Sequence, residues 1–345
     1  MAYSSVGRPV FYIDNYQYHK TIGTDILINE SESTYSLEST LTFPLTLGNG
    51  TRFFNLPVNP INYDFTGNMK YYMAFLNHNF GDNNSEIQMT DAFDTPITDF
   101  EEVLNGNHTG SGVFMPLNGS TILTRSTSDY MTMYKLQSTE FIEGRTLNVG
   151  TVSYGIQYTM PHSPDLKLSM EIEMDGIDTT TTSGGGTISN VKYTGNPLWV
   201  NGDNKTNCFD VYEDTLDVTQ TGARRNGRKS WNLKFSYMSE ADLFSSNPKG
   251  GNYTEHPADS TYNNGDLSSG AQHSENTLAF NIETDDSFYA QVWNKTLGGA
   301  LPFIFQPNSN DNDDFYICRF DQNSLRVSQS AYKVYDISVK IVETW

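Results

Sequence analysis

Hydrophobic and polar residues alternate along three segments of the chain. Residues 166–174 (Leu-Lys-Leu-Ser-Met-Glu-Ile-Glu-Met), 231–237 and 335–341 each place an apolar side chain at every second position. In a β-strand, side chains two residues apart point to the same face of the sheet. Each segment is therefore predicted to be a strand with one solvated face and one packed face. This pattern favours antiparallel pairing over parallel βαβ winding.

Shorter strands are predicted where β-branched and aromatic residues gather between turns rich in Asn and Gly. They cover Val10–Ile13, Met69–Phe75, Thr121–Thr124, Met131–Leu136, Gly150–Thr159 and Phe315–Phe320. A helix is predicted from Thr284 or Asp285 to Lys295, ended by Gly298-Gly299, and a second helix over Thr98–Leu104. The Gly-rich residues 184–186 and the polar stretch 247–272 are predicted to be long loops.

Composition agrees with a chain rich in strands. Of its 345 residues, 37% are hydrophobic and 18% are charged. Both fractions fall below the usual values for globular domains, about 45–50% and about 25%. Uncharged polar residues take up the difference, and 21 Tyr and 20 Phe add residues that favour strands. At about 150 residues per domain, the length predicts two domains with enough chain to bury a core.

Charge and cysteine content argue against several classes of protein. The net charge of −20 opposes nucleic-acid binding, which needs clustered Lys and Arg for phosphate contacts. No apolar stretch approaches the roughly 18 residues of a membrane-spanning helix, and Met1–Asp14 lacks the pattern of a secretion signal. Two cysteines, Cys208 and Cys318, are too few for a disulfide scaffold or a multi-cysteine zinc module. We expect both to be free, buried thiols.

One basic cluster stands out on this acidic chain. Arg224, Arg225, Arg228 and Lys229 lie within six positions, directly before the strand predicted at Trp231. Nucleic acid is one partner for such a cluster, but the negative charge of the chain favours an acidic patch on a neighbouring copy. We therefore predict that Arg225 and Arg228 contact an adjoining subunit.

The chain carries no familiar catalytic motif. His-Glu-x-x-His, Gly-x-Ser-x-Gly, P-loop and Gly-x-Gly-x-x-Gly signatures are all missing from the sequence. We predict no enzymatic activity and no cofactor, although an Asp or Glu pair brought together by folding would suit glycoside cleavage. The loop 308–314 contains Asp311, Asp313 and Asp314, whose oxygens are candidate Ca²⁺ ligands. It lacks the twelve-residue EF-hand pattern, so a solvated hairpin tip is the preferred interpretation.

The C-terminal part of the chain resembles a known family. The resemblance rests on the order of five segments: Ala223–Tyr237, Phe288–Trp293, Leu301–Pro307, Ile317–Phe320 and the closing Glu343-Thr344-Trp345. Two further segments agree with it, Arg145–Leu147 and Met160–Pro164. This order is similar to the tail structural proteins of tailed bacteriophages, particularly marine ones, of the distal-tail or minor-tail kind. The resemblance covers roughly the last 200 residues.

A second segment, Tyr71–Gly81, is similar to the galactose-binding-like jelly rolls that are inserted in phage tail proteins. That resemblance implies a jelly-roll domain over roughly residues 35–160. Asn77, His78 and Asn79 are candidate glycan or packing residues, and a hydrogen-bonded packing role is favoured for His78. The segment departs from the glycan-binding members because no set of Arg, aromatic and acidic residues marks a sugar pocket.

The resemblances imply a structural protein of a phage virion, located in the tail and assembled in the host cytoplasm. The expected fold is mainly β: an antiparallel β-sandwich framework from residues 1–34 and 161–345, a jelly-roll-like β-sandwich domain over 35–160, and one or two short helices. Copies are expected to form a homo-oligomeric ring that docks other tail proteins, with 184–186 and 247–272 as contact arms. The alternative is a carbohydrate-binding receptor-recognition protein for a host surface glycan, and a glycan depolymerase ranks third.

Overall fold

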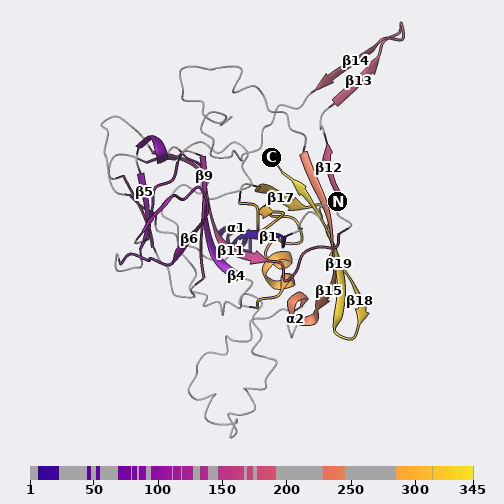
Figure 1. The fold of residues 1–345 in the computed structure, drawn as a ribbon. Coiled ribbons are helices and arrows are strands. Elements are labelled where there is room, and N and C mark those ends of the chain that lie inside the picture. Colours follow the sequence, from indigo (N-terminus) through magenta and orange to yellow (C-terminus); the bar gives the residue numbers. More distant parts are fainter. Residues whose placement is uncertain are drawn as a thin grey trace, which may run out of the picture.

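Strands dominate the structure, a computed structural model, and its helices are short (Figure 1). The structure describes residues 7–22, 45–47, 52–54, 69–78, 80–83, 85–90, 95–110, 112–117, 119–126, 133–138, 147–166, 169–173, 177–191, 228–244, 285–312 and 314–344. The predicted arm 247–272 therefore lies outside the described residues. Among those residues every strand pairing is antiparallel, which confirms the mainly β, antiparallel fold.

Most strands belong to one twelve-stranded sheet. They follow one another in the order β12-β15-β19-β17-β16-β1-β11-β4-β9-β6, with β18 beside β19 and β2 beside β11. Along the chain they are β1 (Val10–Asp14), β2 (Leu45–Leu47), β4 (Met69–His78), β6 (Phe100–Leu104), β9 (Gly119–Arg125), β11 (Leu147–Thr159), β12 (Ser169–Glu173), β15 (Arg228–Ser239), β16 (Phe303–Gln306), β17 (Tyr316–Phe320), β18 (Arg326–Ala331) and β19 (Val334–Glu343). The strands from β12 onward form one end of the sheet and β4, β6, β9 and β11 form the other, with β1 between the two groups.

The N-terminal strand β1 lies in the middle of this sheet. It pairs with β11 on one side and with β16 on the other, so that Tyr12 lies between Gln157 and Ile304. All five residues of β1 are buried. Phe11 and Ile13 belong to one apolar cluster, whereas Val10 and Tyr12 belong to another. Because alternate residues point to opposite faces, β1 is buried on both faces, as its continuous apolar sequence requires.

The first of these clusters is the core of the C-terminal half. The Phe11 ring packs among four other rings, those of Phe288, Phe303, Phe305 and Phe320, with centroids 5.3–6.0 Å away. Trp231, Leu233 and Phe235 of β15 are buried in the same cluster, and so are Ile337, Val339 and Ile341 of β19. The alternation predicted for residues 335–341 is therefore confirmed as one packed and one solvated face, and so is the part of 231–237 up to Phe235. It fails at Tyr237, which is 78% exposed, because a bulge between Phe235 and Met238 buries Met238 in its place.

A five-stranded sheet forms a second layer against the β4–β9 end of the large sheet. Its order is β3-β10-β5-β8-β7, from β3 (Arg52–Phe54), β10 (Met133–Ser138), β5 (Ser85–Thr90), β8 (Val113–Phe114) and β7 (His108–Gly110). Phe114 of β8 and Leu123 of β9 both lie against Gly106, which places the two sheets face to face. This part of the chain is a two-layered β-sandwich.

The domain boundaries 34 and 160 remain a prediction, and the pairing of strands adds detail to it. β11 ends at Thr159 and pairs with β4, a strand of the middle region, and with β1. On its other side, β1 pairs with β16, a strand of the C-terminal region. The two regions therefore share one sheet, with β1 and β11 at the junction.

The helices agree with the sequence at one place and differ at another. The predicted helix after Asp285 is present as a single π-helical segment, η5 (Tyr289–Asn294), which buries Val292. Gly298 and Gly299 end it with φ of +63° and +96°. The helix predicted over Thr98–Leu104 is wrong: most of it forms strand β6, because β6 pairs with β9 and buries Phe100 and Leu104.

Three other helical segments were not anticipated. They are α1 (Asn15–Ile22), η2 (Phe80–Asn83) and α2 (Glu240–Leu243). α1 follows β1 without a loop, and Asp14 accepts a hydrogen bond from the Gln17 backbone N–H at 2.9 Å, as an N-terminal cap does. Ser239 caps α2 in the same way, through the N–H of Asp242.

In strand β12, the packed face predicted for the alternating residues 166–174 is not found. A strand does form there, but its expected packed face is exposed: Met170 and Ile172 are each 55% exposed. β12 is the last strand of the large sheet and pairs with β15 on one side. The packing prediction fails because β12 lies at the sheet edge, beyond the rings that cover β15.

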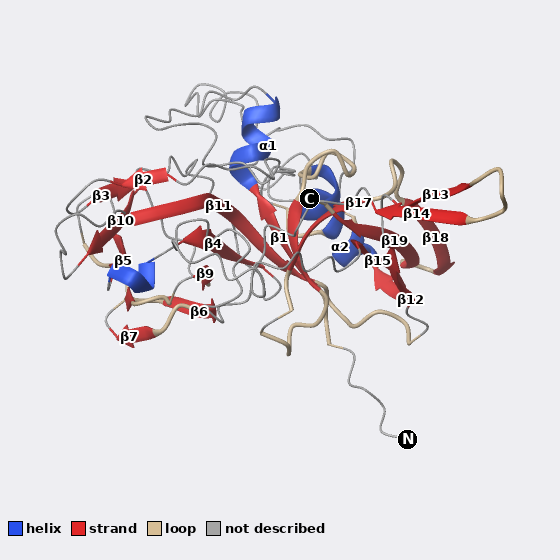
Figure 2. Cartoon of the chain, turned by 90° about the horizontal axis from the view of Figure 1, so that it is seen from above, coloured by secondary structure: helices blue, strands red, loops and turns tan. Residues whose placement is uncertain are grey.

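A two-stranded ribbon follows β12 and extends away from the rest of the molecule (Figures 1 and 2). It consists of β13 (Ile177–Thr181) and β14 (Thr187–Val191), which among the described strands pair only with each other. The residues 184–186, predicted to be a long loop, are instead its tight tip: the Thr182 N–H donates to Gly186 O at 2.7 Å. Gly185 has a φ of +79° there.

The junction between β1 and β11 allows no side chain at residue 155. A Cβ on Gly155 would lie 2.0 Å from Ile13 O and 2.7 Å from Asn15 N. We expect Gly155→Ala to push the two strands apart and lower the free energy of unfolding by about 3 kcal/mol, measured by urea denaturation. The control is Gly184→Ala at the ribbon tip, where a Cβ meets no atom within 4 Å. Equal stability of both variants would contradict the packing of this junction.

Candidate functional site

The basic cluster lies at the start of β15. Arg224 and Arg225 lie outside the described residues, whereas Arg228 and Lys229 are the first two residues of the strand. The Lys229 backbone N–H donates to Glu343 Oε2 at 3.0 Å, and its ammonium group donates to the Tyr316 hydroxyl. The same ammonium lies 4.3 Å from the centroid of the Tyr316 ring, a cation–π contact. Lys229 is therefore bound within its own chain, and the predicted subunit contact of Arg225 and Arg228 remains a prediction.

The acidic loop meets this cluster through one tyrosine. The Tyr316 hydroxyl donates to Asp314 Oδ1, so that Asp314, Tyr316 and Lys229 form a continuous chain of hydrogen bonds. Residue 229 and residue 316 are far apart in the sequence, and the pairing of β17 and β15 with β19 brings them together. Two sites predicted separately thus belong to one polar cluster beside the sheet edge.

The candidate Ca²⁺ ligands do not gather into a metal site among the described residues. Asp313 lies outside them. The backbone carbonyl of Asp311 accepts from Gln306 Nε2 at 2.8 Å, while the Asp314 carboxylate accepts from Tyr316. In this part of the chain, no group of three His, Cys, Asp or Glu side chains could hold a metal ion. The Asp311 N–H donates to Asn308 O at 3.0 Å, so residues 308–311 form a hydrogen-bonded turn.

Burial dominates the chemistry of the groups behind this cluster. Burial, ahead of the Asp314 hydrogen bond and charge, raises the pKa of Tyr316. Cys318 is a free, buried thiol whose pKa burial raises well above its ordinary value, with a smaller contribution from the Glu343 charge. A protonated thiol is a poor nucleophile, so Cys318 acts as a core residue. Cys208 lies outside the described residues.

The structure places His78 inside the sandwich. It is 3% exposed, its Nε2 lies 2.9 Å from the Thr121 hydroxyl, and its ring stacks on Phe80 with centroids 4.0 Å apart. Burial lowers its pKa to about 3, so the ring is neutral at physiological pH. His78 is thus a packing residue and offers no surface to a sugar. The side chain of Asn77 and the whole of Asn79 lie outside the described part.

A buried polar network at the end of β1 was not foreseen from the sequence. Asp14 Oδ2 accepts from the Ser153 hydroxyl at 2.9 Å, and the Ser153 oxygen lies 2.8 Å from the Tyr72 hydroxyl. Burial raises the pKa of Asp14 to about 7, against the opposing effect of its bonds to Gln17 and Ser153. The sequence signal for this site was Asp14 itself, an acidic residue directly after an apolar run, because such a residue can cap a helix.

Asp14 makes stability depend on pH. Because its folded pKa is about 7 and its ordinary value is 3.8, the folded state keeps a proton that the unfolded chain releases between these two values. Stability is therefore lost as pH rises from about 4 to about 7, by on the order of 4 kcal/mol from this group. We expect Asp14→Asn, which keeps an oxygen for the α1 cap, to remove that part of the pH dependence in urea titrations.

The matched control for that variant is Asp178→Asn, on the exposed ribbon. It should leave the wild-type pH dependence unchanged between pH 4 and pH 7. If Asp14→Asn loses stability over this range as steeply as the wild type, the buried carboxyl does not hold the proton.

Comparison of this chain with protein-family models, with curated proteins and with solved structures finds no match. Within the described residues, no helix is long and apolar enough to cross a membrane. The features that remain for a functional argument are the exposed sheet edge at β12, the ribbon beside it and the polar cluster of Lys229, Tyr316 and Asp314.

Proposed function

We propose that this chain is a structural protein that assembles with copies of itself, as a ring-forming component of a bacteriophage tail. The observation that carries the self-assembly is the exposed apolar face at β12, which among the described strands has a neighbour on one side only. Met170 and Ile172 lie on the face of β12 that continues the packed face of β15, because they pair with Trp231 and Lys229. Each is 55% exposed, whereas Trp231 is 6% exposed. Exposed apolar side chains on an edge strand form a surface suited to interaction with another chain.

The virion, the tail and the ring come from the resemblance of the C-terminal segments to tail structural proteins. The long antiparallel sheet suits that role, because a head-to-tail contact between identical rigid subunits closes into a ring when its rotation allows. Assembly in the host cytoplasm agrees with the free thiol of Cys318.

A second candidate, carbohydrate binding, is favoured by two exposed aromatic side chains. Tyr237 is 78% exposed and has a φ of +63° at the bulge in β15, and Tyr332 is 85% exposed at the β18–β19 turn. A bulge redirects a side chain, and an exposed aromatic ring is a surface on which a sugar ring can stack. A glycan array tests this candidate: binding lost in Tyr237→Ala supports it, and no binding by the wild type rules it out for the glycans on the array.

The mass of the purified protein in solution tests the assembly. Multi-angle light scattering should give a discrete multiple of the 38.8 kDa chain mass. Comparison at about 0.1 M and about 1 M salt separates two contacts, because screening weakens an exposed ionic contact of the basic cluster and leaves apolar edge contacts intact. A monomer at every concentration and in both buffers would contradict self-assembly.

A further inference from the structure

The ribbon β13–β14 is an arm without a described partner. Residues 178–190 are all exposed, and Ile188 is 53% exposed. Within the ribbon, Thr179 and Ser189 make a cross-strand hydrogen bond at 3.2 Å. A two-stranded ribbon alone in water is marginally stable, and a further strand or a packed face is needed to hold it. The ribbon is thus an element that gains stability from a partner.

The sequence of the ribbon suits pairing along its edge. Its strands are Ile-Asp-Thr-Thr-Thr and Thr-Ile-Ser-Asn-Val, rich in residues that favour strands. Natural edge strands are protected from pairing by Lys, Pro or inward charges, and this ribbon has none of those devices. Asp178 is the one charged residue between Ile177 and Val191. The ribbon edge is therefore open to another strand.

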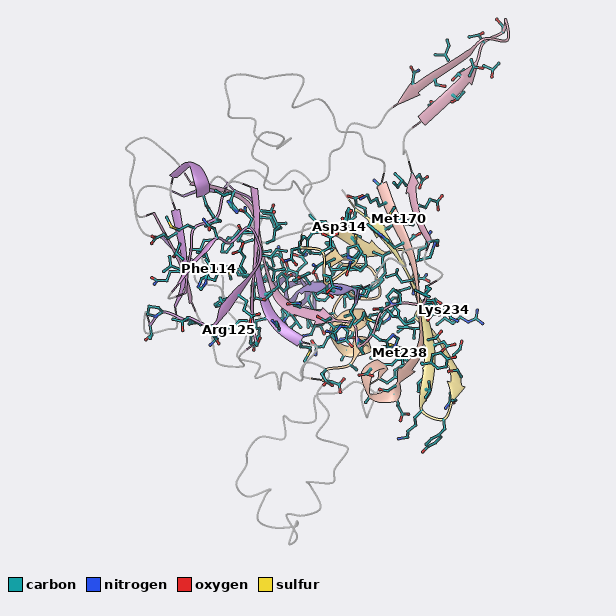
Figure 3. All side chains as sticks on the ribbon, viewed as in Figure 1. Phe114, Arg125, Met170, Lys234, Met238 and Asp314 are labelled. Atoms are coloured by element: carbon teal, nitrogen blue, oxygen red, sulfur yellow. The ribbon has the colours of Figure 1, made fainter. Side chains whose placement is uncertain are left out.

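Among the described strands, β12 has a hydrogen-bonding neighbour on one side only, β15. Strand β12 ends the large sheet, all five of its residues are exposed, and Met170, labelled in Figure 3, is its second residue. Met170 and Ile172 extend the apolar face of the sheet there. A strand added beside β12 would complete its backbone hydrogen bonds and cover these two side chains.

A second copy of this chain is the partner that supplies both parts of the contact, because each copy carries one ribbon and one β12 edge. Two molecules with a net charge of −20 repel each other, so a contact between them must involve surfaces of low net charge. The ribbon, with one charged residue in fifteen, is such a surface. At the edge, Glu173 pairs across from Arg228, and the charges of Glu171 and Glu173 act on Lys340, whose pKa is raised by its bond to Asp321 and by these carboxylates. Arg228 and Lys340 thus place positive charge of the same chain near the acidic side chains of β12.

We propose that the β13–β14 ribbon of one copy adds to the β12 edge of the next copy, extending its sheet. Each chain then provides one ribbon and one edge, so the contact is head to tail and repeats from copy to copy. This inference rests on the proposed self-assembly and identifies the surfaces that make it.

Cross-linking between two different variants tests the contact. Both carry Cys208→Ser, so that the buried Cys318 is the one natural cysteine left. One variant has Met170→Cys and a mass tag, and the other has Ile188→Cys. A short bis-maleimide added to the mixture should give a tagged–untagged dimer, and neither variant alone should give a cross-linked dimer in more than a tenth of that yield.

The control replaces Ile188→Cys by Tyr332→Cys, which is also exposed but belongs to the turn between β18 and β19. This mixture should give no product above background. A second variant replaces residues 177–191 with a Gly-Ser linker, and we expect it to weaken self-association at least tenfold with little change in Tm. The sheet keeps its described pairings in that variant, because β13 and β14 pair with no other strand that the structure describes.

The outcomes separate this inference from the proposed function. An oligomer that gives no Met170–Ile188 product and survives the linker replacement overturns the ribbon contact and leaves self-assembly standing. A double variant, Met170→Cys with Ile188→Cys, that cross-links within one chain when diluted also overturns it, since the ribbon would then cover its own edge. A wild-type protein that stays monomeric overturns both.

Discussion

The fold depends on the burial of strand β1 from both sides. A strand in the middle of a sheet needs a hydrogen-bonding neighbour along each edge, and β1 finds them in β11 and β16. Its odd-numbered side chains, Phe11 and Ile13, fill the core of the C-terminal half, while Val10 and Tyr12 fill the cluster shared with β4. Five residues near the N-terminus thus require segments about 145 and about 295 positions later to be in place. Such long-range contacts are costly in loop-closure entropy and are stable only together.

The two ends of the large sheet differ in what covers them. At the β6–β9 end, a second sheet covers the apolar face, and Phe114 and Leu123 meet across the layers at Gly106. At the β12 end, Met170 and Ile172 remain exposed, and the ribbon that follows them stands apart (Figure 3). The contrast between a covered end and a bare end underlies the proposal of self-assembly. The acidic charge of the chain then restricts the contact to segments with little net charge.

The local sequence pattern predicted the strands that are packed on one face and solvated on the other. Trp231, Leu233 and Phe235 alternate with polar residues and are buried as expected, and a buried, hydrogen-bonded His78 is the favoured interpretation of that residue. The same alternation in β12 predicts its strand but says nothing about what covers it. The local sequence of Thr98–Leu104 predicts a helix, but most of this stretch is a strand because it pairs with β9. Tertiary pairing of this kind lies outside the reach of a local pattern.

The polar sites were harder to predict, because they join residues that are distant in sequence. Lys229 and Asp314 were both identified as candidates, each with a different external partner, and Tyr316 links them within the chain. The Asp14–Ser153–Tyr72 network joins three strands whose order no local signal shows. Fold class therefore follows from residue patterns, whereas the partner of each charged residue follows from strand order.

Native-state hydrogen exchange, resolved by strand, tests most directly whether β1 joins the two halves into one cooperative unit. The account predicts that amides of β1, β4, β11, β16 and β19 exchange with one common free energy of opening, equal to that of global unfolding. Two separate free energies, one for β4 and β9 and another for β15 and β19, with β1 exchanging at the lower of the two, would contradict it.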